Sequence, residues 1–417
     1  MKILFITDNF PPEVNAPATR TYEHCREWVK SGAAVTVITC APNFPRGLVY
    51  EGYKNRFVQK ETVDGINVIR VWSYIARNEG FLKRSLDYFS FAVSSFFAGL
   101  TAKADVIIAT SPQFFTTLSA SFLSRIKKRP WIFELRDLWP ESIKTVGAMP
   151  DGVLMRMLEK IEIALYRDSS MVVALTPAFK RNLISRGIDP GKIQVVTNGA
   201  NMELFAPREK NRELVKRHHL KGKFVVSYIG THGMAHSLEF IVRSLGGISD
   251  PAIHFLFIGD GALKEKIVRT ARQMGLRNAT FLDPVAKEMV PCYLSVADAA
   301  LVPLRKSDTF KTVIPSKIFE AAAMRKPVLL GVEGQAREII EEYNAGICFE
   351  PENEADFLRK TEKIKNDGRF CRMCQEGCEK LAHDFDRKKL ALDMHSYMAD
   401  MLAWRHNGSG YPVRDQK

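Results

Sequence analysis

The segment Pro315–Leu330, PSKIFEAAAMRKPVLL, contains a complete loop–helix–strand unit. Pro315 closes a loop, and Ser316 is a residue type that favours the N-cap of a helix, which we expect to run to about Met324. Lys326-Pro327 ends that helix, because proline cannot continue it, and an apolar run typical of a buried strand follows. Helices that alternate with continuous apolar strands predict a parallel sheet covered on both faces.

The same alternation occurs in two sets along the 417 residues. The first set of predicted strands comprises 3–6, 35–39, 66–72, 105–110, 131–135, 171–176 and 193–198. The second set comprises 224–230, 254–259, 279–283, 299–304 and 327–331. We therefore predict an α/β protein with two Rossmann-like, doubly wound domains, which bind ligands at the carboxyl ends of their strands.

The domain boundaries follow from the gap between the two sets. Residues 198–223, between the two sets, hold a turn, a proline and a charged helix, and we place the linker there. The first domain is predicted to span 1–200 and the second 208–385. The last helix, about 386–402, either completes the second domain or crosses back to the first. The tail 403–417 is rich in glycine, serine and charge, and we expect it to be disordered.

Composition narrows the class of protein. Hydrophobic residues make up 46% and charged residues 26%, which excludes disordered, collagenous and coiled-coil chains. The net charge of +13 suits nucleic acid, an anionic bilayer or phosphorylated substrates alike, but no basic-aromatic motif supports nucleic acid. We expect no signal peptide in MKILFITDNF and no membrane span, since the longest uncharged stretch, 106–124, is too polar.

The seven cysteines are an odd number, which favours a reducing, cytoplasmic compartment. Cys371, Cys374 and Cys378 have a spacing that fits either a metal cluster or one face of a helix. No fourth ligand is evident beside them, so we favour the helix face and expect no metal.

The start of the predicted helix 316–324 is a candidate anion site. A helix N-terminus at a strand's carboxyl end presents unpaired N–H groups and a positive dipole end, which suit a diphosphate. Glu320 lies one turn farther on the same face, in position to accept hydrogen bonds from a ribose diol. The alternative is a solvated helix residue, but the apolar neighbours of Glu320 favour a buried helix, where an unpaired carboxylate is costly.

Pro-Ser-Lys-x-x-Glu-Ala at 315–321, followed by a Lys-Pro-Val strand, resembles the donor-site signature of the family 4 retaining glycosyltransferases, which have the GT-B fold. Further matches occur in order, at 197–207 (TNGANMELFAP), 258–261 (IGDG) and 297–304 (ADAALVPL). The segments 9–20 (NFPPEVNAPATR) and 134–142 (ELRDLWPES) resemble the bacterial branch that builds surface polysaccharides, including N-acetylfucosamine-type transferases of O-antigen and capsule assembly. The resemblance covers about residues 1–402.

The resemblance implies a metal-independent transferase, without a cofactor, that moves an N-acetylated or deoxy hexose from a UDP-sugar to a polyprenyl-diphosphate-linked saccharide. It implies that Asp137 and Lys317 are catalytic, although Asp137 is equally placed to cap a helix after Pro140. The implied donor-binding residues are Gly230, Thr231, His236, Gly259, Asp283, Lys311, Thr312, Ile314, Pro315, Ser316 and Glu320. The implied acceptor-binding residues are Asn15, Ala16, Arg20 and Arg136.

The sequence departs from the family pattern at two donor-site positions. Thr312 replaces a glutamate that touches the transferred sugar in the family, which suggests a different sugar ring. The loop 230–236, GTHGMAH, lacks the Arg and Lys that commonly hold the diphosphate. We expect Thr231 or His236 to substitute, with Lys311 or Lys317 supplying charge.

In the first domain, Asn15-Ala16 replaces the Gly-Gly that is frequent in the family, and Arg20 is a candidate contact for the acceptor's phosphate. Glu134 and Arg136 are expected to form an internal ion pair rather than to act in catalysis.

Two segments of the first half are candidates for membrane contact. Residues 81–100 are rich in phenylalanine, and 153–167 alternate apolar and basic residues at helical spacing. Both patterns also fit ordinary core helices. Together they favour a cationic face that binds the anionic inner surface of the plasma membrane.

Two other functions stay open at this point. One is a GT-B-fold UDP-sugar epimerase, which would convert the UDP-sugar without an acceptor. The other is a non-catalytic nucleotide-binding scaffold of a polysaccharide assembly complex.

Overall fold

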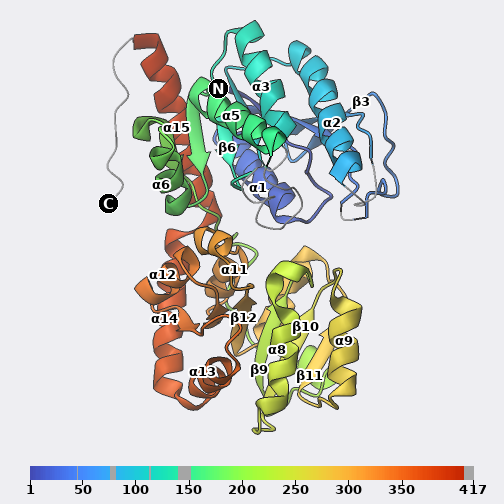
Figure 1. The fold of residues 1–417 in the computed structure, drawn as a ribbon, viewed down its shortest axis with the longest axis vertical. Helices are drawn as coiled ribbons and strands as arrows, with labels where there is room; N and C mark the ends of the chain where they lie inside the picture. The colour runs from blue at the N-terminus through green and yellow to red at the C-terminus, as the bar shows by residue number, and fades with distance from the viewer. Residues whose placement is uncertain (45, 76–80, 112–113, 140–151, 408–417) are drawn as a thin grey trace. The chain divides into compact units, whose positions relative to one another are not determined.

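The computed structural model describes residues 1–44, 46–75, 81–111, 114–139 and 152–407. They form two compact units, the first from residues 1–197 and the chain from Lys388 onward, the second from Asn198–Arg387. Each unit is a sheet with helices packed against it (Figure 1). The predicted α/β class and doubly wound architecture are confirmed.

The first unit contains an eight-stranded sheet in the order β3-β4-β2-β1-β5-β6-β7-β8. All neighbours are parallel except β3 and β4. The bounds are β1 Lys2–Ile6, β2 Ala34–Cys40, β3 Val58–Val63, β4 Ile66–Val71, β5 Val106–Thr110, β6 Trp131–Leu135, β7 Met171–Ala174 and β8 Ile193–Val195. Every predicted strand of this unit is present, and β3 is an addition that the sequence analysis missed.

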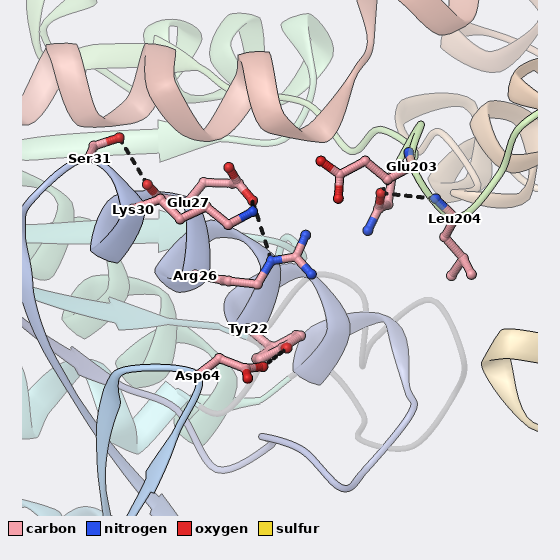
Figure 2. Close-up of polar contacts among 9 residues, drawn as sticks. Tyr22, Arg26, Glu27, Lys30, Ser31, Asp64, Glu203 and Leu204 are labelled. Atoms are coloured by element: carbon pink, nitrogen blue, oxygen red, sulfur yellow. Dashed lines mark hydrogen bonds and ion pairs between the residues drawn. The ribbon is translucent and has the colours of Figure 1, made fainter.

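The extra strand forms a hairpin with β4. Its two-residue turn, Asp64-Gly65, has positive φ at both positions (48° and 80°), as a type I′ turn requires. Tyr22 donates a hydrogen bond to the Asp64 carboxylate (Figure 2), which ties the turn to the adjacent helix.

Six described helices belong to the first unit: α1 Ala16–Lys30, α2 Phe81–Thr101, α3 Phe114–Lys127, α5 Val153–Asp168, α6 Pro177–Ser185 and α15 Arg387–Asn407. Asn15 caps α1 by accepting the Ala18 N–H at 2.9 Å. On α15, Met394 and Met398 are buried in the core cluster that also contains Trp28, whose Nε1 donates to the Ala391 carbonyl at 2.7 Å.

The last helix therefore packs with the first unit. Residues 403–407, which we expected to be disordered, continue α15. The rest of the predicted tail, 408–417, lies outside the described residues.

The second unit contains a six-stranded parallel sheet in the order β11-β10-β9-β12-β13-β14. The strands are β9 Phe224–Ile229, β10 Ile253–Ile258, β11 Ala279–Leu282, β12 Ala299–Pro303, β13 Val328–Gly331 and β14 Gly346–Cys348. The α-helices are α7 Arg212–Arg217, α8 Leu238–Ser244, α9 Lys264–Gln273, α10 Val290–Val296, α11 Lys317–Ala323, α12 Gln335–Glu342, α13 Glu354–Asn366 and α14 Gly368–Asp384. Short 3-10 turns include η2 Met234–His236, η4 Lys287–Met289 and η5 Asp308–Thr312.

The three clustered cysteines lie on α14, on the helix face that the alternative interpretation predicted. Cys374 and Cys378 are buried, and the Cys378 thiol is 3.1 Å from the Ala345 carbonyl oxygen. Within the described ranges, no group of three or more His, Cys, Asp or Glu side chains is placed to hold a metal ion. Of the helices described, none combines the length and apolarity needed to cross a bilayer.

Candidate functional site

The loops that follow β9 and β10 in the second unit pack backbone against backbone. A Cβ on Gly259 would lie only 1.9 Å from the carbonyl oxygen of Gly230, so this contact requires glycine. The loop after β9 is further fixed by hydrogen bonds from His232 N to Asp260 O (2.8 Å) and from Arg305 N to Ala235 O (2.9 Å). At the carboxyl end of β9, the backbone of the loop is therefore closely packed and held in place by hydrogen bonds.

Lys317, the first residue of α11, extends its side chain to this surface. Its Nζ lies 3.9 Å from the centroid of the Tyr228 ring, and a Cβ on Gly230 would approach the same Nζ within 2.7 Å. The Nζ atom is buried and has no hydrogen-bond partner among the described residues. Burial lowers the pKa of Lys317 to about 7, while the charge of Glu320 acts in the opposite direction.

Two histidines lie in the loop beside Lys317. Burial, with Lys264 and Lys317 as further causes, lowers the pKa of His232 to about 4. Burial and then the charge of Lys317 lower the pKa of His236 to about 3. Both imidazoles are therefore neutral at pH 7, so His236 can supply a polar contact to an anion but not a positive charge. Thr231 is exposed in the same loop.

Glu320 lies on α11, one turn beyond Lys317, and forms an ion pair with Lys287 of η4. Its side chain is 16% exposed, and the Lys287 ammonium also lies 4.8 Å from the centroid of the Phe205 ring. In the sequence analysis, the cost of burying an unpaired carboxylate argued against a purely structural role for Glu320. The structure shows that this carboxylate has a partner, Lys287. Sequence reasoning missed Lys287, which is distant in the chain and belongs to no motif.

The remaining predicted donor residues have diverse surroundings. Ile314 is buried, and Ser316 occupies the N-cap position without forming a side-chain capping bond. Thr312 donates its hydroxyl to the Thr309 carbonyl at 2.9 Å. Lys311 and Asp283 form exposed ion pairs, with Asp308 and Lys264 respectively, both at 2.7 Å. Because α11 has only seven residues, its dipole contributes little positive charge at this edge.

In the first unit, Arg20 is buried and forms an ion pair with Glu134 at 3.0 Å. Its other nitrogens donate to the carbonyls of Thr197 (2.6 Å) and Val196 (2.9 Å). Glu134 thus pairs with Arg20, and the charge of Arg136, the partner that we expected, also lowers the pKa of Glu134. The geometry favours a structural role for Arg20, and its contact with an acceptor's phosphate stays a prediction.

A chain of amide hydrogen bonds starts at Asn15, which donates to Asn9, and Asn9 in turn donates to Asp8 at 2.6 Å. Burial raises the pKa of Asp8 to about 8, and the nearby carboxylates of Glu13 and Asp87 add to the rise. This carboxyl group after β1 was missed in the sequence analysis. The signal for it was in the sequence: the polar residues Asp8 and Asn9 come directly after the buried strand β1, where its carboxyl end meets the loop.

The other predicted residues of the first unit lie near the end of β6 or the start of α1. Arg136 donates to the Pro17 carbonyl at 3.3 Å, and Ala16 is the first residue of α1. Asp137 is partly buried and its carbonyl accepts the Trp139 N–H at 2.9 Å. The helix that Asp137 was predicted to cap, after Pro140, lies outside the described residues.

The second unit thus presents, at its strand ends, a glycine-lined loop, a buried lysine amine and a carboxylate one helical turn away. Two Rossmann-like units, with these side chains at the carboxyl ends of the strands, are the architecture of the GT-B fold, and ligands of such sheets bind at that edge. The chain belongs to the glycosyltransferases: residues 15–199 match the glycosyl transferase 4-like domain, and residues 223–367 match the glycosyl transferases group 1 domain. It is therefore a transferase, as the sequence motifs predicted.

Comparisons with individual proteins agree. WcaI of Escherichia coli (strain K12), named as a glycosyl transferase of colanic acid biosynthesis, is 24% identical over 365 residues, covering 85% of this chain and 89% of WcaI. Sucrose-phosphate synthase from Thermosynechococcus elongatus superimposes with a TM-score of 0.79 at 16% identity, over 96% of this chain and 99% of that one. Anabaena Alr3699/HepE in complex with UDP-glucose gives 0.72 at 17%, over 96% and 99%. The predicted GT-B fold is confirmed.

Proposed function

We propose that this chain is a retaining glycosyltransferase of bacterial surface-polysaccharide assembly, in the O-antigen or capsule class. It transfers an N-acetylated or deoxy hexose from a UDP-sugar to a polyprenyl-diphosphate-linked saccharide. The name of WcaI supports the pathway class, and the UDP-glucose complex of HepE supports the donor class. The observation that carries the proposal is that the buried amine of Lys317 and the carboxylate of Glu320 lie one turn apart on α11, at the strand ends of the second unit.

These residues suit the parts of such a donor. The diphosphate binds beside the Gly230 loop and Lys317, and Glu320 accepts hydrogen bonds from the ribose diol. During transfer, the bond between the sugar's anomeric carbon and the diphosphate oxygen breaks, and its electron pair stays on the UDP. The acceptor hydroxyl attacks the same face and its proton passes to that oxygen, so no enzyme nucleophile, metal or cofactor is required.

The test is incubation with a panel of UDP-sugars and a short-chain polyprenyl-diphosphate saccharide, in excess chelator. We expect a glycosylated lipid with retained anomeric configuration, measured by nuclear magnetic resonance, and undiminished turnover because Lys317 replaces a metal in stabilising UDP. Conversion of the UDP-sugar without acceptor would support the epimerase, and nucleotide binding without turnover would support the scaffold. Activity that requires added manganese or magnesium would contradict metal independence.

Glu320→Ala is expected to weaken UDP binding by about 1.5–3 kcal/mol, or roughly 10- to 150-fold, because a hydrogen bond to a charged group is lost. Glu320→Gln is the matched control: it keeps the shape and one acceptor oxygen but loses the charge, so its effect should be smaller. Circular dichroism verifies that both variants keep the overall helix content of the wild type. Unchanged UDP affinity of Glu320→Ala in titration calorimetry would remove Glu320 from the ribose site.

We further propose that the first unit binds peripherally to the anionic, cytoplasmic face of the plasma membrane. Helices α2 and α3 lie side by side (Figure 1), joined by the bond from Ser95 Oγ to Ser119 Oγ at 3.1 Å. We define their apolar–basic surface, together with the start of α5, by large apolar side chains that are exposed by 41–79%: Leu86, Phe89, Val93, Phe97, Phe122, Ile126, Val153, Leu154 and Met157.

Basic side chains accompany these apolar ones. Lys83, Arg156 and Lys160 are exposed on α2 and α5, and Lys128 and Arg129 follow α3. Exposed apolar side chains flanked by basic residues favour binding to an anionic membrane surface over exposure to water.

A further inference from the structure

The side-chain amine of Lys317 is buried but forms no hydrogen bond with the described residues. Its Nζ is buried against the face of the Tyr228 ring and has no hydrogen-bond partner in the described part of the chain. Lys326, a partly buried lysine of the same unit, shows what a structural lysine does here: its Nζ donates to the Ser295 carbonyl at 3.2 Å. A buried amine without an acceptor costs free energy, so the contrast indicates that the acceptor of Lys317 is a ligand.

The surroundings of Nζ determine its charge before a ligand binds. Tyr228 of β9 offers only its ring, and the neighbouring histidines, His232 and His236, are neutral at pH 7. The charge of Glu320, on the same helix, favours the charged amine, but this carboxylate is already paired with Lys287. The ring of Tyr228 and the charge of Glu320 therefore offset only part of the cost of burying an ammonium in the ligand-free protein, since the pKa of Lys317 is still lowered.

We propose that Lys317 acquires its charge together with the donor: binding of the nucleoside diphosphate transfers one proton from solvent to Nζ, and the resulting ammonium pairs with the diphosphate. This inference rests on the proposed function, because it requires a donor with a diphosphate. It accounts for the missing Arg and Lys in the loop 230–236, since one buried amine supplies positive charge only when the anion is present. The same ammonium then stabilises the extra negative charge that UDP gains when the sugar leaves.

The proton can be counted. With a pKa of about 7, Lys317 is roughly nine-tenths neutral at pH 8 and nine-tenths charged at pH 6. Binding should therefore take up about 0.9 proton at pH 8 and about 0.1 at pH 6, and above pH 7 the dissociation constant should rise by up to about tenfold per pH unit. The terminal phosphate of UDP, with a pKa of about 6, is already ionised at pH 8 and contributes little there.

The experiment is calorimetric titration of the full-length protein with UDP, and separately with GDP, at pH 8 in two buffers of different ionisation enthalpy. Lys317→Met should bind more weakly, without proton uptake and without the rise in dissociation constant between pH 7 and 9. Lys317→Arg, which stays charged, should also lose that pH dependence. Lys326→Met is the matched control and should keep both the proton uptake and the pH dependence.

The outcomes separate the two proposals. Absence of binding by either nucleotide contradicts the proposed function and this inference with it. Tight binding of UDP without proton uptake, or equal pH dependence in wild type and Lys317→Met, overturns the inference and leaves the donor assignment in place. Binding of GDP in preference to UDP, with the proton uptake intact, supports the inference and corrects the base of the donor.

Discussion

Charge reversal at four basic residues of the first unit is expected to abolish binding of the protein to anionic lipid vesicles. The four residues are Lys83, Arg84, Arg156 and Lys160. Each basic side chain near an anionic surface contributes about 1 kcal/mol, so their combined loss of about 4 kcal/mol lowers the partition coefficient roughly a thousandfold. The measurement is co-sedimentation with vesicles of phosphatidylglycerol and phosphatidylcholine. Wild-type binding should decrease with added salt, because charges are screened over about 8 Å at physiological ionic strength.

The control for this experiment is an equal change of charge elsewhere. In the second unit, the exposed residues Lys216, Arg269, Arg272 and Arg277 can also be replaced by glutamate. This variant should pellet almost like wild type, and the first variant should still bind UDP, because the donor site lies in the second unit. Equal pelleting of wild type and the first variant, or none by either, would exclude membrane binding through the apolar–basic surface.

The fold was predictable where burial is complete. Strands β5 and β6 are buried along their whole length and β1 is buried after its first residue, so their continuous apolar runs stand out from the helices around them. Strand β3 alternates exposed and partly buried positions and contains few apolar residues, because it pairs on one side only. The Asp64-Gly65 turn was the signal that could have revealed it.

The sequence predicted which residues belong to the candidate site, but not which side chains they contact. Motifs in the sequence located Lys317 and Glu320, because helix and loop signals are local. The partner of Glu320 is Lys287, and it comes close only because η4 and α11 meet in the folded second unit. Burial of the Lys317 amine likewise depends on Gly230, on another loop, leaving room for it. Long-range contacts of this kind follow from strand order, which single-sequence patterns do not contain.

The largest expected effect on stability concerns the buried ion pair of the first unit. Arg20→Met is expected to lower the free energy of unfolding of this unit by about 3–5 kcal/mol, because it leaves Glu134 buried without its ion-pair partner. It also removes the donor from the carbonyls of Val196 and Thr197, so it should cost more than Glu134→Gln, which leaves Arg20 bonded to both. The double variant Arg20→Met with Glu134→Met should regain part of the loss, since it removes both charges.

The sequence offers a selective probe for this measurement. All five tryptophans (Trp28, Trp72, Trp131, Trp139 and Trp404) belong to the first unit, so tryptophan fluorescence during urea unfolding reports that unit alone. UDP binding to the second unit then serves as the control for intact folding there.

The pH dependence distinguishes the ion pair from simple packing. Burial alone would raise the pKa of Glu134, but Arg20 and Arg136 outweigh it and the pKa is lowered. The folded state therefore binds fewer protons than the unfolded state near pH 4, so this contribution to stability is present above the unfolded pKa of about 4.3 and is lost on acidification through the folded pKa. Arg20→Met should lose that contribution, so the stability difference between wild type and variant should shrink on acidification. If Arg20→Met lowers the free energy of unfolding by less than about 1 kcal/mol and leaves its pH dependence unchanged, the ion pair has no structural role. The predicted contact of Arg20 with the acceptor's phosphate would then be favoured.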